Sequence, residues 1–324
     1  GEAERTDNRN YPGPWRSIQA QILAAPADEQ AWLALAEAFW QADRYHEALN
    51  CRLKAFALVP DRVTAETYWL TGNGFAEIGQ ADQAIACYRQ AIDRDPGLSE
   101  VWVNWGNLLL LQDEPAAARA IVEAALAAGH DRVELYLVLA ETYRCVGDLA
   151  AAIPAYRAAL DRDPPDRFAL CSTLFNCYFA TLELDKAIAM GEAAIALKPD
   201  CADTHYNLSF AYLLAGDYPR GFAAYEWRWA AGRHFHALSV PPWDGKTSLL
   251  NQTILIWADQ GYGDALQFVR FLPELARQNC RIILCCLPAL VPLLAALPSV
   301  AATYGFGERL PDFDCHFPPM SLPT

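Results

Sequence analysis

The chain has 324 residues, of which 53% are hydrophobic and 20% charged, and its formal net charge is −14. This composition excludes a disordered or fibrous protein, and the length fits two domains or one long repeat array. The acidic balance excludes nucleic acid or an anionic membrane surface as the main partner, because both attract basic proteins. Residues 1–236 hold 32 of the 39 acidic and 20 of the 25 basic side chains, so the charge belongs almost entirely to that part.

Ten cysteines are present without a Cys-x-x-Cys pair, so we predict no metal site and a reduced, cytoplasmic protein with cysteines in its core. The most apolar stretch, residues 282–298, contains three prolines, and no membrane span is predicted there. The sequence begins with Gly and ends in Ser-Leu-Pro-Thr, which suggests a trimmed fragment of a longer protein.

A repeat of 34–36 residues fills positions 29–229, with units beginning at residues 29, 65, 99, 133, 168 and 202. Small residues recur at the eighth and twentieth positions, where they let two antiparallel helices approach closely. Proline near the thirty-second position ends the second helix, because it lacks the N–H that the next turn needs. The twenty-fourth position favours an aromatic residue but carries Arg52, Val122 and Gly191 in three units.

These residues resemble the tetratricopeptide repeat family, in six consecutive copies. The resemblance implies an all-α right-handed superhelix of about six helical hairpins, whose first helices line a concave groove. Residues 1–28 are then a leader and a capping helix, the latter predicted over residues 15–25.

Groove residues of that family come mainly from the second, fifth, ninth and twelfth positions of each unit. The candidate peptide-groove residues on this basis, with two asparagines of the sixth position, are Glu37, Trp40, Trp69, Asn73, Asn104, Asn107, Glu141, Asn176 and Asn207. Asparagine carries both donors and an acceptor, so a row of such side chains can bind the backbone of an extended peptide. The alternative is that these polar residues are simply the solvated face of amphipathic helices.

Acidic residues at the second position of four units predict the sign of the ligand's charge. They are Glu66, Glu100, Glu134 and Asp203. An acidic row repels an anionic peptide and attracts a basic one. We therefore expect a protein or peptide partner that is neutral or basic rather than acidic.

The last part of the chain has a different pattern. Residues 230–252 form a turn-rich linker, and strand-like runs follow at 253–258, at 281–286 and, more weakly, at 300–304. Helical runs are predicted between them, over 265–278 and 287–297. Strands that alternate with helices indicate a parallel sheet, so residues 253–324 are predicted to form a partial, Rossmann-like α/β domain.

The turn after the first predicted strand carries the candidate chemistry. Gln260, Gly261, Gly263 and Asp264 stand between the strand and the following helix, where parallel sheets bind ligands. Glycines permit a tight turn and close approach of the backbone. The alternative for Asp264 is structural: an N-cap residue whose capping box Gln267 completes.

Segments 225–229, 241–245, 258–275 and 310–323 resemble bacterial proteins that join such repeats to a region similar to the heptosyltransferase group of GT-B glycosyltransferases. The architecture is more distantly similar to that of O-linked N-acetylglucosamine transferase. The resemblance implies that Asp264 is a candidate general base on an acceptor hydroxyl, with Gln260, Gly261 and Gly263 beside it. A GT-B enzyme has two α/β domains, and the second binds most of the nucleotide-sugar. We therefore expect no cofactor in this chain, and a nucleotide-sugar only in a full-length protein.

Three hypotheses remain open at this point. The leading one is a repeat scaffold that binds a protein or peptide in its groove and is fused to an incomplete glycosyltransferase-like domain. The second is the N-terminal fragment of a bacterial GT-B glycosyltransferase whose repeats select the acceptor, which leaves the enzymatic status of the chain open. The third is self-association through the exposed edge of the partial sheet.

Overall fold

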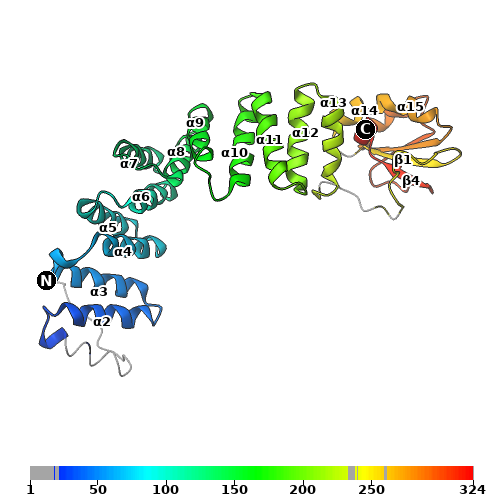
Figure 1. Cartoon of the computed structure of the whole chain (residues 1–324). Helices are drawn as coiled ribbons and strands as arrows, with labels where there is room; N and C mark the ends of the chain where they lie inside the picture. Colours follow the sequence, from blue (N-terminus) through cyan, green and yellow to red (C-terminus); the bar gives the residue numbers. More distant parts are fainter. Residues whose placement is uncertain (1–17, 19–21, 233–237, 239, 259–260, 324) are drawn as a thin grey trace. The chain divides into compact units, whose positions relative to one another are not determined.

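The computed structural model describes residues 18, 22–232, 238, 240–258 and 261–323 (Figure 1). The chain divides into two compact units, residues 1–167 and 168–324. Within the described residues, twelve α-helices pair into hairpins. These are α2 (Glu29–Trp40) with α3 (Tyr45–Leu58), α4 (Ala65–Glu77) with α5 (Ala81–Arg94), α6 (Ser99–Leu111) with α7 (Pro115–Ala127), α8 (Val133–Cys145) with α9 (Leu149–Leu160), α10 (Arg167–Ala180) with α11 (Leu184–Leu197), and α12 (Ala202–Leu214) with α13 (Tyr218–Tyr225).

The predicted repeat frame is confirmed, because the first helix of every hairpin begins within one residue of the predicted unit start. The turn inside each hairpin repeats as well. In all six units the fifteenth residue has a positive φ, at Asp43, Gly79, Asp113, Gly147, Leu182 and Gly216. Glycine and aspartate tolerate this left-handed conformation, and Leu182 is the member that adopts it against its side-chain preference.

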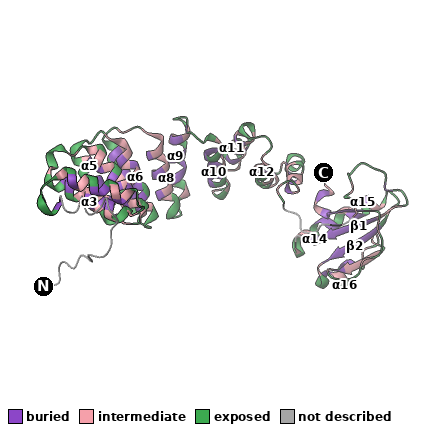
Figure 2. Ribbon diagram, turned by 90° about the horizontal axis from the view of Figure 1, so that it is seen from below, coloured by how far each residue is buried: buried purple, intermediate pink, exposed green. Residues whose placement is uncertain are grey.

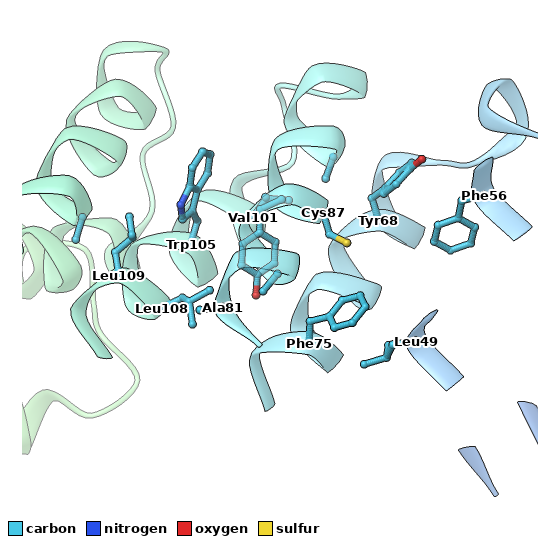
Figure 3. Packing of buried hydrophobic residues seen from close by; sticks show 14 of the residues in the cluster. Leu49, Phe56, Tyr68, Phe75, Ala81, Cys87, Val101, Trp105, Leu108 and Leu109 are labelled. Carbon is cyan, nitrogen blue, oxygen red and sulfur yellow. The ribbon is translucent and has the colours of Figure 1, made fainter. Parts of the chain in front are cut away.

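The core of the first unit is a chain of buried rings and aliphatic side chains between successive hairpins (Figure 3). Phe75 has no exposed surface and Tyr88 has 1%. The small eighth residue makes this packing tight, because a Cβ added to Gly72 would lie 2.7 Å from Cε1 of Tyr88. The small residue at this position is needed because the Tyr88 ring packs directly over Gly72.

Alanine at Gly72 is expected to lower the free energy of unfolding of the first unit by about 1–3 kcal/mol, because the Tyr88 ring must move to admit the methyl group. Gly263 is the matched control, since nothing lies within 4 Å of a Cβ built there and it stands in a helix. Alanine at Gly263 should leave stability unchanged or raise it by less than about 1 kcal/mol. Urea denaturation of both variants measures the difference, and equal effects would contradict the packing argument.

The predicted capping helix lies mostly outside the described residues, as do residues 1–17 of the leader. Ile18 and residues 22–24 are helical. Ile22 is 8% exposed and packs with Leu35, Ala36 and Phe39 of α2. This part of the chain therefore covers the apolar side of the first hairpin.

The second unit ends in a parallel four-stranded sheet, in the order β3-β2-β1-β4. Its strands are β1 (Thr253–Ala258), β2 (Arg281–Cys286), β3 (Ala302–Gly305) and β4 (Cys315–Phe317). The first two strands coincide with the predicted runs, and β3 lies one to two residues later than predicted. The strand order reverses its direction between β1 and β4.

The predicted continuous helices around this sheet are wrong in extent. The segment predicted as a helix over 265–278 consists of α14 (Tyr262–Phe268), a 3-10 turn and α15 (Leu272–Ala276). Pro273, which lacks an N–H, stands in the first turn of α15 and forces the break. The segment 287–297 forms a 3-10 turn and the four-residue α16 (Val291–Leu294), with prolines at the start of each.

Both faces of the sheet are covered, which explains why its strands are continuous apolar runs. In Figure 2 the central strands are coloured as buried. Ile254, Ile256 and Leu284 pack with residues of α14, α15 and α16 on one face. Leu255, Trp257 and Ile283 pack with Trp229 and with residues 304–313 on the other.

A buried histidine on the short strand β4 gives the second unit a pH-dependent stability. His316 is 5% exposed, and its Nδ1 accepts a hydrogen bond of 2.9 Å from the indole N–H of Trp257. Burial lowers the pKa of His316, because the imidazolium form is poorly solvated there. An unfolded chain therefore binds this proton more readily, and stability is lost as the pH falls below the ordinary histidine range.

We expect the wild-type second unit to lose more stability than His316→Gln when the pH falls from about 7.5 to about 5.5. Carboxylates titrate equally in both proteins, so the difference between their unfolding free energies isolates the histidine. Parallel curves for the two proteins across this range would contradict the assignment.

Candidate functional site

Two of the predicted groove asparagines form a pair in the first unit. Nδ2 of Asn104 donates to Oδ1 of Asn73 over 2.7 Å, and the Tyr88 hydroxyl donates to the same oxygen over 2.9 Å. The tyrosine comes from α5 and the asparagines from the first helices of two successive hairpins. Because Oδ1 of Asn73 accepts both bonds, its NH₂ group and the carbonyl of Asn104 are the atoms left to recognise a ligand.

The same two repeat positions carry asparagine in the second unit as well. Asn176 and Asn207 are 31 residues apart, as are Asn73 and Asn104, and both line one small hollow of about 30 Å³. Both side chains are exposed. Two of the predicted groove asparagines are thus hydrogen-bonded to each other in the first unit, and two line one hollow in the second.

The remaining predicted polar groove residues differ in their surroundings. Asn107 and Glu37 are exposed, and Oε1 of Glu37 accepts a bond of 3.1 Å from Gln41. Glu141 accepts from the Tyr156 hydroxyl and forms an ion pair of 2.5 Å with Arg144. Glu141 is therefore already neutralised, whereas Asn107 lies open to solvent.

The two predicted tryptophan anchors are half-buried. Trp69 packs against the core of the first unit, and its buried indole Nε1 makes no hydrogen bond within the described residues. Trp40 lies edge-on to Tyr45 at 4.9 Å and beneath the Arg52 guanidinium at 5.1 Å. Both side chains therefore contribute to the packing of the first unit.

The acidic row at the second repeat position is partly neutralised by a residue that the sequence argument missed. Arg132 forms ion pairs with Glu100 and with Glu134, the latter at 3.2 Å. The pKa of Glu134 is lowered, first of all by its hydrogen bond from Arg132. The sequence did offer a hint of these ion pairs. Arg132 directly precedes the first helix of the fourth unit and stands two residues before Glu134.

Asp264 lies half-buried in the first turn of α14, directly after β1. The structural alternative, in which Asp264 caps this helix, is wrong. The N-cap is Gly261 at φ 134°, and no side chain caps the helix. Glycine holds this backbone conformation without strain. Gly263 follows within the helix, and Gln260 lies outside the described residues.

The motif segments 225–229, 258–275 and 310–323 meet in the second unit. The Tyr225 hydroxyl lies 3.5 Å from Sδ of Met320, and Phe222 contacts Phe268 edge-on. Burial is the main cause that raises the pKa of Tyr225, and the nearby charge of Asp264 adds to it. The last helical hairpin therefore packs against α14, the helix whose first turn carries Asp264.

A buried ion-pair network fixes this junction. Arg228 is 3% exposed and pairs with Glu226 at 2.5 Å. The Arg228 guanidinium also donates to Ser321 Oγ, and Ser321 in turn donates to Glu226 over 2.7 Å. The three side chains tie the end of α13 to the last turn of the described chain.

Aromatic side chains missed by the sequence argument lie at the same junction. Tyr206 and Phe210 of α12 lie edge-on at 4.9 Å, and Tyr225 contacts both. Phe210 is 38% exposed. Phe210 occupies the ninth position of the sixth unit, and nothing in the sequence placed it beside Tyr225.

Among the residues that the structure describes, no three His, Cys, Asp or Glu side chains are placed to hold a metal ion. Each helix of these residues is too short or too polar to span a membrane.

Sequence models of the tetratricopeptide repeat match residues 28–96, 76–141 and 135–168. This part of the chain therefore consists of tetratricopeptide repeats. Among solved structures, the C-terminal part of a TPR repeat-containing protein from Cytophaga hutchinsonii is similar at a TM-score of 0.56, with 14% identity, covering 68% of this chain and 90% of that one. The MamA protein is similar at a TM-score of 0.46, with 21% identity over 54% of this chain and 97% of that one.

The chain is also similar to the protein O-mannosyl-transferase TMTC1 of Mus musculus, at 31% identity over 86 residues. The human protein of that name is 27% identical over 99 residues. These matches cover 26% and 30% of this chain but only 9% and 11% of the two relatives.

Proposed function

We propose that this protein is a repeat scaffold that binds an extended peptide segment of a protein partner along the groove lined by its first helices. The observation that carries the proposal is the recurrence of an amide pair at the same repeat positions, Asn73 with Asn104 and Asn176 with Asn207. Amide side chains bind peptide N–H and C=O groups without demanding a particular peptide side chain.

The preferred ligand is neutral or basic. The support is the acidic excess of residues 1–236 and the exposed carboxylates of Glu37 and Glu66. Arg132 weakens this preference locally, because it already neutralises Glu100 and Glu134. The ten cysteines form no disulfide, which supports a reducing compartment such as the cytoplasm.

Selection of a phage library of random twelve-residue peptides on the immobilised chain tests the proposal. We expect enrichment of peptides whose net charge is zero or positive and which compete with one another for binding. A selection that enriches no peptide would contradict groove binding. Enrichment of acidic peptides would be consistent with groove binding but would contradict the predicted preference for neutral or basic peptides.

A second function is favoured by the position of Asp264. It lies where the strand order reverses between β1 and β4, which is where open parallel sheets bind ligands. Its charge also acts on Tyr225 of the last hairpin. We propose on this basis that the α/β part belongs to a glycosyltransferase whose repeats present the acceptor, with Asp264 as general base. The name of the TMTC1 relatives, which are O-mannosyl-transferases, agrees with this class of reaction.

Sugar transfer by the full-length protein tests the second function. Mass spectrometry should detect a hexose, heptose or N-acetylhexosamine on an acceptor peptide in the presence of nucleotide-sugars. Asp264→Asn should abolish this transfer while peptide binding stays intact. Undiminished transfer by the variant would remove Asp264 from the mechanism.

A further inference from the structure

Asn73 and Asn176 differ in the residue that the twenty-fourth position of their own repeat unit places beside them. In the second and fourth units a tyrosine stands there, and its hydroxyl bonds the polar residue of the ninth position, Tyr88 to Asn73 and Tyr156 to Glu141. In the fifth unit the same position is Gly191. No tyrosine hydroxyl from that position can reach Asn176.

Neighbouring side chains fill the space beside Gly191 only in part. A Cβ added there would lie 2.8 Å from Leu208 Cδ1 and 3.1 Å from Phe175 Cδ2, so these two side chains lie against the glycine itself. Nearer to the amides, a hollow of about 30 Å³ remains, lined by Ser172, Phe175, Asn176, Gly191, Ala194, Thr204 and Asn207. This volume suits a group of one or two heavy atoms.

The lining of this hollow, which we call the Gly191 slot, indicates which small group it accepts. The Ser172 hydroxyl donates its proton to the Phe168 carbonyl over 2.9 Å, and the Thr204 hydroxyl donates to Cys201 Sγ over 3.2 Å. Each hydroxyl has only one proton, so both oxygens keep lone pairs for a donor. The NH₂ groups of the two asparagines supply donors beside them. A guest hydroxyl group can donate and accept at the same time, whereas a methyl group can do neither.

We propose that the Gly191 slot is a specificity subsite that takes a serine side chain of the bound peptide, while Asn176 and Asn207 hold the peptide backbone on either side of it. The inference rests on the proposed peptide-binding function and adds a residue preference to it. Larger side chains are excluded by volume, because Phe175 and Ala194 close the slot. The first unit has no equivalent preference, since Tyr88 occupies the corresponding place beside Asn73.

The test uses peptides enriched from the random twelve-residue phage library on the full chain, resynthesised with serine, alanine or valine at the shared position. We expect enriched peptides to share one serine. Alanine there should weaken binding about fivefold, the effect of one hydroxyl hydrogen bond, and valine should weaken it further. In the double variant Ser172→Ala/Thr204→Val the serine and alanine peptides should bind equally.

Thr173→Val is the matched control, because Thr173 bonds the Ala169 carbonyl in the same helix and does not line the slot. It should retain the fivefold preference for serine. A selection without any enriched peptide would contradict the proposed function itself. Enriched peptides without a shared serine, or an unchanged serine preference in the double variant, would contradict the proposal that the Gly191 slot binds serine. Neither result would contradict peptide binding in the groove.

Discussion

Simultaneous replacement of Asn73, Asn104 and Asn107, all in the first unit, by alanine is expected to weaken binding of a groove peptide by about 100-fold. Each substitution removes a side-chain hydrogen bond to the peptide backbone, worth about 1 kcal/mol, and about 1.4 kcal/mol corresponds to a factor of ten. At Asn73 the change also leaves the Tyr88 hydroxyl without its acceptor. Fluorescence anisotropy of a labelled peptide from the phage selection measures the dissociation constant.

The matched control replaces three exposed glutamines outside the predicted groove positions, Gln83, Gln112 and Gln278. This variant should bind within about twofold of wild type, because Gln83 lies on a second helix, Gln112 follows the C-terminal end of α6 and Gln278 follows α15, and none occupies a predicted groove position. Circular dichroism should show the same helical content for both triple variants. Equal affinities of the asparagine variant and wild type would refute the asparagines of the first unit as ligand contacts.

Alanine at Arg228 is expected to lower the free energy of unfolding of the second unit by about 3 kcal/mol. The guanidinium is buried, is paired with Glu226, bonds the Tyr225 carbonyl over 3.2 Å and lies over the Tyr225 and Trp229 rings. Removing it leaves Glu226 and Ser321 without their cation and opens a cavity at the junction. Native-state hydrogen exchange in α13 and β1 follows the loss.

Arg277→Ala provides the comparison for Arg228. Arg277 also pairs with a glutamate, Glu274, but the two side chains are 75% and 73% exposed. Such a pair contributes less than about 1 kcal/mol. If Arg228→Ala were no less stable than Arg277→Ala, the network with Glu226 and Ser321 would not be what fixes the last hairpin against the α/β part.

Much of the helical architecture could be predicted because each repeat unit places particular residue types at fixed positions. Small residues at two fixed positions and a proline at a third determine where helices pack and end, so the six unit starts agree with the structure. The broken helices after β1 and β2 could not be placed as well. Prolines 273, 288 and 292 were visible in the sequence, but the apolar pattern around them is continuous.

The strand β4 escaped prediction for a different reason. It has three residues, and its place beside β1 is fixed by backbone pairing of Ile254 with Cys315 rather than by any local pattern. A short run such as Cys315–Phe317 has no periodicity of its own. The strand β4 forms because residues 315–317 pair with the edge of β1.

The candidate groove residues could be selected from their positions, but their interactions could not. Asn73 and Asn104 were separate candidates in the sequence, and the bond between them depends on how two hairpins stack. Gly191 was visible as a departure from the aromatic pattern. The hollow beside Gly191 depends on how the Leu208 and Phe175 side chains pack there, and no sequence pattern predicts this packing.

Photo-crosslinking tests most directly the claim that the first helices form the binding face. Benzoylphenylalanine is placed at Asn107, which is exposed on a first helix, or at Gln83, which is exposed on a second helix. A biotinylated peptide from the phage selection is then added and irradiated. We expect a crosslinked product from position 107 and none from position 83. A product from position 83 without one from position 107 would contradict this expectation.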